Sequence, residues 1–286
     1  MIPCAIIGIL LLSSCRLLGE VLPVPATSSP SPAALPNNTP LTAVSPAMPA
    51  IVTPEPDSGW LELHPGMQRR TINLTNEQGI LVETLFLLRF DPAQYRIGVG
   101  YHEVPQSLSA WQAESGALVV VNGGYYRVEI EIYIPTGLTV VDGEVIGTSY
   151  GDFAGMLAVS ATGAELRWLA QKPYDPQEAL TAALQSFPLL VKPGGEMGFG
   201  AEHEDNLQAR RTVIAQDRSG RWVLLVASSG SFSLHRLSAY LAASDLELDI
   251  ALNLDGGPSS GLLLADPYQE IPSLTPLPVV ITIHPR

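Results

Sequence analysis

Cysteine is almost absent from this sequence. Its 286 residues include two cysteines, Cys4 and Cys15, and both lie within the first fifteen positions. Residues 16–286 therefore cannot form disulfides, use a thiolate nucleophile or hold zinc through cysteine. The chemistry of the folded part must depend on oxygen and nitrogen groups.

Positive charge is also scarce. Two lysines and thirteen arginines stand against 28 acidic residues, and the formal net charge is −13 at pH 7. A surface with this charge repels nucleic acid and anionic lipid, so we expect neither as a general partner. An anionic substrate would have to be recognised by a few arginines, which gives each arginine more weight.

The apolar run at residues 5–12 is too short to span a bilayer. It leads into Leu12-Ser13-Ser14-Cys15, which resembles a bacterial lipobox. The resemblance predicts a lipoprotein signal peptide over residues 1–15, with lipidation at Cys15. It also predicts an exported protein, anchored to a membrane at the cell surface or in the periplasm. A plain secretory signal is the alternative.

Residues 16–58 have the composition of a tether. Residues 21–58 contain ten prolines and no aromatic residue. Such a segment buries too little apolar surface to offset the entropy of ordering it, and its prolines favour an extended chain. We expect a disordered tether over residues 16–58 and a folded domain over residues 59–286.

The pattern of apolar residues predicts many short strands in the folded domain. Asp142-Gly143 between two β-type runs is a strong hairpin signal. Helix signals occur at three places, including residues 176–184, where Asp175 is suited to be the N-cap and Pro176 the first helical residue. The fold class predicted is α+β, with a mixed, largely antiparallel sheet core and about three inserted helices. The ranges expected to be strands are 83–90, 95–100, 117–121, 139–146, 156–159, 165–169, 185–191, 210–215, 221–227, 249–254 and 279–283, and the other two helices are expected within 109–114 and 234–243.

Two apolar runs end in an unusual way. One ends in Asn253-Leu254-Asp255-Gly256-Gly257, and the other ends in Asn122-Gly123-Gly124. Paired glycines let backbone N–H groups approach a bound group closely, and a carboxylate at the end of a strand is held on a rigid element. Either ending alone could be a tight turn. Two of them in one chain predict a site where two strand ends meet.

Two further segments carry polar groups of interest. Arg210-Arg211 stands at the start of a predicted strand, where a guanidinium could bind phosphate or carboxylate, or could form an ordinary surface ion pair. Residues 194–206 are rich in glycine and acidic residues, which fits either a solvated loop or a lid. The oxygens of this loop suit calcium, but no EF-hand spacing is present. We therefore predict no metal and no cofactor, while bound calcium stays open.

Four motifs in order resemble the phosphodiester glycosidase family. They are residues 122–126 (NGGYY), 185–189 (QSFPL), 211–212 (RT) and 253–260 (NLDGGPSS), and the similarity spans roughly residues 83–284. The resemblance implies hydrolysis of a sugar 1-phosphodiester of the N-acetylglucosamine type, on a cell-envelope or extracellular glycoconjugate such as an exopolysaccharide. Phosphate is a good leaving group, so positive charge and hydrogen-bond donors can replace much of the acid that other glycosidases need.

The resemblance also assigns roles. Asp255 is expected to be nucleophile, base or stabiliser of the oxocarbenium ion, Arg211 to hold the departing phosphate, and Asn122 to orient a sugar hydroxyl or the attacking water. The carboxylate that pairs with Asp255 is open among Glu129, Glu131 and Asp152. Expected substrate-binding residues are Gly123, Gly124, Gln185, Gly256, Gly257, Ser259 and Ser260.

Two other functions fit the same sequence. One is a non-catalytic lipoprotein that binds an envelope glycan or teichoic acid, and the other is a structural envelope protein whose glycine turns are only corners. In the enzyme and in the binder, the expected partners are a phosphorylated glycan and the membrane, reached through the lipid anchor.

Overall fold

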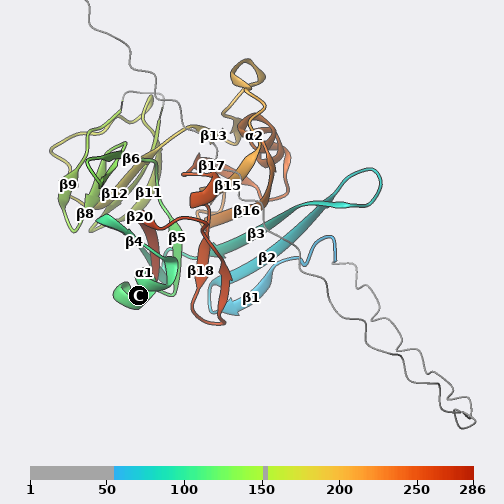
Figure 1. Ribbon diagram of the computed structural model, residues 1–286, viewed down its shortest axis with the longest axis horizontal. Helices are drawn as coiled ribbons and strands as arrows, with labels where there is room; N and C mark the ends of the chain where they lie inside the picture. Colours follow the sequence, from blue (N-terminus) through green and yellow to red (C-terminus); the bar gives the residue numbers. More distant parts are fainter. Residues whose placement is uncertain (1–54, 151–153) are drawn as a thin grey trace, which may run out of the picture. The chain divides into compact units, whose positions relative to one another are not determined.

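Three antiparallel sheets and a separate hairpin make up most of the described chain. The computed structural model describes residues 55–150 and 154–286 (Figure 1). The lipobox at Cys15, the tether up to residue 54 and Asp152 lie outside these residues. Within them, every strand pairing is antiparallel, so the mixed pairing that we expected is not found there. No helix in this part of the chain is long and apolar enough to cross a membrane.

The largest sheet has eight strands. We refer to it as the large sheet. In order across the sheet, the strands are β1 (Leu61–His64), β2 (Met67–Thr75), β3 (Leu81–Phe90), β16 (Trp222–Phe232), β15 (Ala209–Asp217), β17 (Leu248–Asn253), β13 (Leu189–Lys192) and β14 (Glu196–Met197).

The other two sheets have five strands each. We refer to them as the β5 sheet and the β10 sheet, and β6 (Tyr126–Glu129) pairs with β7 (Ile132–Pro135) as a separate hairpin. The β5 sheet has the order β19 (Gln269–Ile271), β18 (Leu262–Leu264), β5 (Val119–Asn122), β20 (Leu277–Pro285) and β4 (Tyr95–Gln106). The β10 sheet has the order β11 (Gly163–Trp168), β10 (Gly155–Ser160), β12 (Leu180–Ser186), β8 (Thr139–Val141) and β9 (Glu144–Ile146).

The three sheets share one core because alternate side chains of their strands point inward. Phe86 and Leu252 of the large sheet, Val121 and Ile281 of the β5 sheet and Leu184 of the β10 sheet belong to the same buried cluster. Burial of these apolar surfaces is the main source of stability for the fold.

Two α-helices cover outer faces of the sheets (Figure 1). They are α1 (Leu108–Ser115), which packs Trp111 on the β5 sheet, and α2 (Leu234–Ala243), which packs Leu237 and Leu241 on the large sheet. Ser233 caps α2, since its hydroxyl accepts from Arg236 N at 3.3 Å. Two short 3₁₀ turns complete the described elements, η1 (Ala201–His203) and η2 (Gly257–Ser259).

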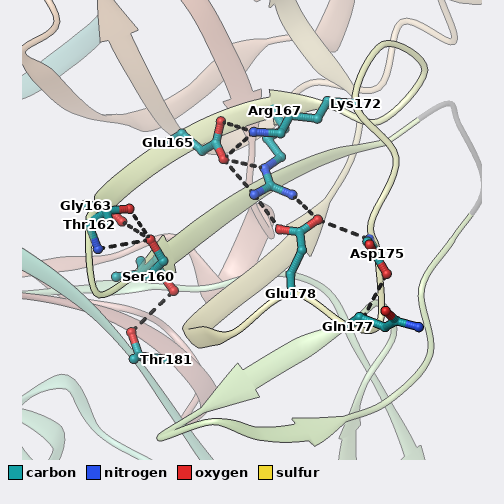
Figure 2. Close-up of polar contacts among 11 residues, drawn as sticks. Ser160, Thr162, Gly163, Glu165, Arg167, Lys172, Asp175, Gln177, Glu178 and Thr181 are labelled. Atoms are coloured by element: carbon teal, nitrogen blue, oxygen red, sulfur yellow. Dashed lines mark hydrogen bonds and ion pairs between the residues drawn. The ribbon is translucent and has the colours of Figure 1, made fainter.

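The prediction of a third helix, over residues 176–184, is wrong. Gln177 N does donate to the Asp175 carboxylate at 2.9 Å, but the chain then forms a single turn and enters β12. Glu178 does not face solvent in a first helical turn, because its carboxylate binds the guanidinium of Arg167 (Figure 2). The apolar residues after it fill a central strand between β10 and β8, and this tertiary pairing outweighs the local helix signal.

Candidate active site

The ends of β17 and β5 meet, as the sequence predicts. Asp255, two residues beyond β17, donates its backbone N–H to the carbonyl oxygen of Gly123, one residue beyond β5, at 3.0 Å. Asn122, the last residue of β5, donates from Nδ2 to the carbonyl oxygen of Asp255 at 2.8 Å. The large sheet and the β5 sheet are therefore joined directly beneath the carboxyl group of Asp255.

The side chain of Asn122 is buried and uses all its bonding groups within the protein. Its Oδ1 accepts from Thr212 Oγ1 at 2.7 Å and from Gly261 N at 3.1 Å. Its Nδ2 donates to the carbonyl oxygens of Asp255, at 2.8 Å, and of Gly123, at 3.3 Å. Asn122 therefore positions the strand ends, and its amide has no group left to orient a sugar hydroxyl or water.

Asp255 carries its carboxyl group at the half-buried rim of this junction. Oδ1 accepts from Gly256 N at 2.9 Å, and the hydroxyl of Ser259 also bonds to the carboxylate. Burial raises the pKa of Asp255 above its ordinary value, while the bonds from Ser259 and Gly256 act in the opposite direction. The N–H of Gly256, expected to contact the phosphate, is thus committed to Asp255.

Arg211 lies beside the same turn. Its Nε donates to the carbonyl oxygen of Phe232 at 3.1 Å, and Nη2 donates to that of Leu207 at 2.6 Å. A β-carbon on Gly256 would lie 3.7 Å from Nη1, so the guanidinium reaches the glycine turn. Among the described residues it forms no ion pair with a carboxylate, and burial lowers its pKa.

Tyr125 is a site residue that the sequence did not single out. Asn253 Nδ2 donates to its hydroxyl at 2.7 Å, and its ring stacks on Phe187 with centroids 4.6 Å apart. Burial raises the pKa of Tyr125 to about 12, and the negative charge of Asp255 adds to the shift while Arg211 opposes it. The phenol therefore stays protonated at neutral pH, close to both proposed catalytic groups. Its position within the NGGYY motif could have identified Tyr125 as a site residue from the sequence.

The glycines provide room at the strand ends. A β-carbon on Gly123 would lie 2.7 Å from Val279 Cγ1, and one on Gly124 would lie 3.0 Å from the carbonyl oxygen of Gln185. A β-carbon on Gly256 would lie 3.0 Å from the carbonyl oxygen of Arg210. Gly257 has φ +59°, a conformation that side chains disfavour. These glycines allow the close contact between strands, which is a structural role whether or not they also touch substrate.

Several buried polar atoms around the junction have no hydrogen-bond partner among the described residues. Gln185 accepts from Leu138 N at 3.1 Å and from Tyr150 N at 2.8 Å, which leaves its Nε2 unpaired. The hydroxyl of Ser260, fully buried behind Ser259, is also unpaired. Since unpaired buried polar groups are rare in native proteins, these atoms are candidates for contact with water or ligand.

Neither Glu129 nor Glu131, the two proposed partner carboxylates that the structure describes, is among the groups that act on Asp255. Glu129 ends β6, where it pairs with Arg127 at 2.6 Å, and Glu131 lies in the exposed turn of the hairpin with φ +68°. Asp152 lies outside the described residues. In residues 55–150 and 154–286 there is also no group of three or more histidines and acidic residues that could hold a metal ion.

Comparison with known proteins bears on this junction directly. A family model described as phosphodiester glycosidase matches residues 115–283, which include β5, β15, β17 and the glycine turns. The chain belongs to the phosphodiester glycosidase family. No curated protein matches the sequence.

Solved structures share the fold at low sequence identity. The zebrafish N-acetylglucosamine-1-phosphodiester alpha-N-acetylglucosaminidase catalytic domain, auto-inhibited by its pro-peptide, is 17% identical with a TM-score of 0.61, covering 77% of this chain and 83% of that chain. A hypothetical protein from Synechocystis is 14% identical with a TM-score of 0.55, covering 79% and 63%. A Burkholderia pseudomallei protein named as exported is 13% identical with a TM-score of 0.53, covering 71% and 74%. At these identities the likeness concerns the fold.

Proposed function

We propose that this phosphodiester glycosidase hydrolyses a sugar 1-phosphodiester of the N-acetylglucosamine type, carried on a cell-envelope or extracellular glycoconjugate. The observation that carries the proposal is the guanidinium of Arg211, which forms no ion pair with a carboxylate of the described residues and reaches the turn that also holds Asp255. A buried cation without a carboxylate partner is well suited to a dianionic or monoanionic phosphate.

In this reaction water adds to the anomeric carbon and the bond from that carbon to the phosphate oxygen breaks. Arg211 binds the phosphate and stabilises the negative charge that it gains on leaving. Asp255 faces the anomeric carbon as nucleophile, base or stabiliser of the oxocarbenium ion. Tyr125 supplies a protonated hydroxyl at the same place. Because a phosphate monoester leaves without prior protonation by a strong acid, a single carboxyl group at this site suffices.

Asn122 and Ser259 act through Asp255 in this proposal. Asn122 fixes its backbone and Ser259 bonds to its carboxylate. The backbone of Gly257 and the amide of Gln185 are proposed to contact the substrate.

We propose further that the enzyme works outside the cytoplasm as a lipoprotein anchored through Cys15. The lipobox motif and the structural neighbour that is named as exported support this location. Residues 16–58 would then hold the catalytic domain away from the membrane surface, within reach of wall or extracellular glycans.

An oxygen-label experiment tests the proposed reaction. The full chain is incubated in ¹⁸O-water with N-acetylglucosamine α-1-phosphate esterified to mannose, and the phosphate product is examined by mass spectrometry. Cleavage between carbon and oxygen leaves the mannose phosphate free of ¹⁸O. Label in the phosphate would show attack at phosphorus and would contradict glycosidase chemistry. Saturable binding without release of N-acetylglucosamine would instead support the glycan-binding alternative.

A further inference from the structure

A cavity of about 880 Å³ lies at the opposite ends of the strands that build the candidate active site. In β20, Val280 pairs with Asn122 at the site, whereas His284 lines the cavity four residues further on, roughly 13 Å along a strand. In β12, Gln185 belongs to the site end and Thr181 lines the cavity. The cavity is therefore separate from Asp255 and Arg211.

Hydroxyl groups line one wall of this cavity. Ser160 and Thr162 belong to the β10–β11 turn, and their hydroxyl oxygens lie 2.9 Å apart (Figure 2). Thr181 of β12 lies next to this turn and donates to the carbonyl oxygen of Val159 at 3.3 Å. Thr282 of β20 adds a hydroxyl from the β5 sheet. This density of hydroxyls suits a ligand rich in hydroxyl groups.

Two arginines line the other wall, Arg96 of β4 and Arg286. Arg96 of β4 and His284 of β20 are direct cross-strand partners, and both line the cavity. Burial and the charge of Arg96 lower the pKa of His284, so the two side chains do not favour positive charge together. Asp142, in the exposed β8–β9 turn, is the one acidic residue among those described as lining the cavity. In a protein with net charge −13 this concentration of cations is unusual.

The floor of the cavity includes Trp222, which is 1% exposed. Its indole Nε1–H has no acceptor among the described residues. An indole N–H is only a donor, and a buried donor without an acceptor destabilises the folded protein. Trp222 therefore both lines the cavity and carries a buried donor that has no acceptor among the described residues.

We propose that this cavity is a second binding site, for an anionic segment of a glycan. Arg96, which lies beside His284, binds the phosphate or carboxylate. The hydroxyls of Ser160, Thr162 and Thr181 bind the sugar. The volume lies within the range of pockets that hold a ligand of drug size, which suits one or two sugar units. The site would hold a glycan away from the catalytic groups, and it does not require that the protein hydrolyse it.

Nuclear magnetic resonance of the indole N–H groups tests the proposal on the full chain. Four tryptophans are present, so four indole signals are expected. Glucose 6-phosphate and glucuronate serve as probes of phosphate and carboxylate, and glucose is the neutral control. We expect the Trp222 signal to move with one or both anionic sugars and to stay in place with glucose. Assignment uses Trp222→Phe or, if that variant does not fold, single Trp→Phe changes at the other three positions.

Charge-reversal variants locate the binding. Arg96→Glu should weaken binding of the anionic sugar about tenfold or more. Arg236→Glu is the matched control, because Arg236 is an exposed arginine on α2 that does not line the cavity, and it should bind as the wild type does. Asp255→Asn and Arg211→Met should also leave the Trp222 shift intact, which separates this site from the catalytic one. A Trp222 signal that ignores both anionic sugars, equal binding of glucose, or unchanged binding by Arg96→Glu would overturn the proposal.

Discussion

Arg167 and Arg211 are buried to the same extent, at 6% exposure, but their surroundings differ. Arg167, in the β10 sheet, is bound by Glu165 and Glu178, each at 2.6 Å from Nη2 (Figure 2). Arg211, in the large sheet, is bound by two backbone carbonyls and by no carboxylate of the described residues. Burial opposes the charge of both, but the two glutamates raise the pKa of Arg167, whereas the pKa of Arg211 is lowered.

The difference separates a structural arginine from one that is prepared for an anion. Carbonyl dipoles hold the Arg211 guanidinium in place without cancelling its charge, so it keeps most of its attraction for a phosphate. The charge of Arg167 is already matched by its two neighbours. Burial alone therefore does not identify a functional arginine; the charge of its partners does.

The carboxyl groups beside the two arginines should differ most in activity. Asp255→Asn keeps the shape of the side chain and should lower kcat about 10,000-fold if Asp255 reacts at the anomeric carbon. Glu178→Gln is the matched control and should leave kcat unchanged, because Glu178 serves only Arg167 and its turn. Initial rates of N-acetylglucosamine release check both. An active Asp255→Asn variant would remove Asp255 from the mechanism.

Replacing the two arginines should likewise have different effects: loss of activity for Arg211 and loss of stability for Arg167. Arg211→Met removes the charge that stabilises the leaving phosphate and should lower kcat/KM about 1,000-fold. Arg167→Met should keep the activity but cost about 2 kcal/mol of unfolding free energy, since it leaves Glu165 and Glu178 without their shared cation. Kinetics together with urea unfolding measure both quantities. Loss of activity in the Arg167 variant under conditions where it is folded would break the comparison.

Asn122 should behave as a positioning residue in which stability and activity fall together. Asn122→Ala leaves Thr212 Oγ1, Gly261 N and the carbonyl oxygen of Asp255 without partners, which should cost about 3 kcal/mol of unfolding free energy. We expect kcat to fall and KM to change little, because Asn122 does not touch substrate. An increase in KM alone would indicate direct contact with the sugar.

The smallest expected effects concern the pH dependence of stability, which should change in opposite directions in Glu178→Gln and Asp255→Asn. The hydrogen bond to Arg167 lowers the pKa of Glu178 from its ordinary 4.5, so its stabilisation is present above that value and lost as the pH falls through the lowered pKa. Glu178→Gln should thus cost roughly 1 kcal/mol at neutral pH and nothing in strong acid.

Asp255→Asn should have the opposite effect and stabilise the folded protein at neutral pH. Burial raises the pKa of Asp255 above its ordinary 3.8, so its ionised form destabilises the folded protein at higher pH. The variant should be more stable than the wild type at neutral pH, and this gain should disappear below 3.8, where the carboxyl is protonated in both folded and unfolded states. Unfolding curves over a pH series measure both variants, and a loss of stability in Asp255→Asn at neutral pH would contradict the assigned environment.

Local patterns in the sequence predicted the strands and hairpins well. The Asp142-Gly143 turn is confirmed, with φ of +50° and +84°. Alternation of apolar residues also located β3, β15 and β16, because each buries one or both faces against a neighbouring layer. The helix predicted over residues 176–184 failed because its start signals were real but local, and they form a turn held by Arg167 before β12.

At the site, the glycine-rich strand ends and the presence of Asp255 and Arg211 at them could be predicted from sequence. The pairing of Tyr125 with Asn253 could not, because it joins residues 128 positions apart. The commitment of Asn122 to Thr212 and Gly261 was also hidden, since a motif names a residue without giving its partners. The same limit applies to Arg211, whose distinctive feature is that it is buried yet forms no ion pair with a carboxylate of the described residues.

The central claim is that the Arg211 charge serves the phosphate, and two substrates with the same sugar test it directly. Wild type and Arg211→Met are compared on an N-acetylglucosamine α-1-phosphodiester and on the nitrophenyl α-glycoside of N-acetylglucosamine, which has no phosphate. We predict a loss in kcat/KM of about 1,000-fold on the phosphodiester and of less than about tenfold on the nitrophenyl glycoside. An equal loss on both substrates would contradict the claim.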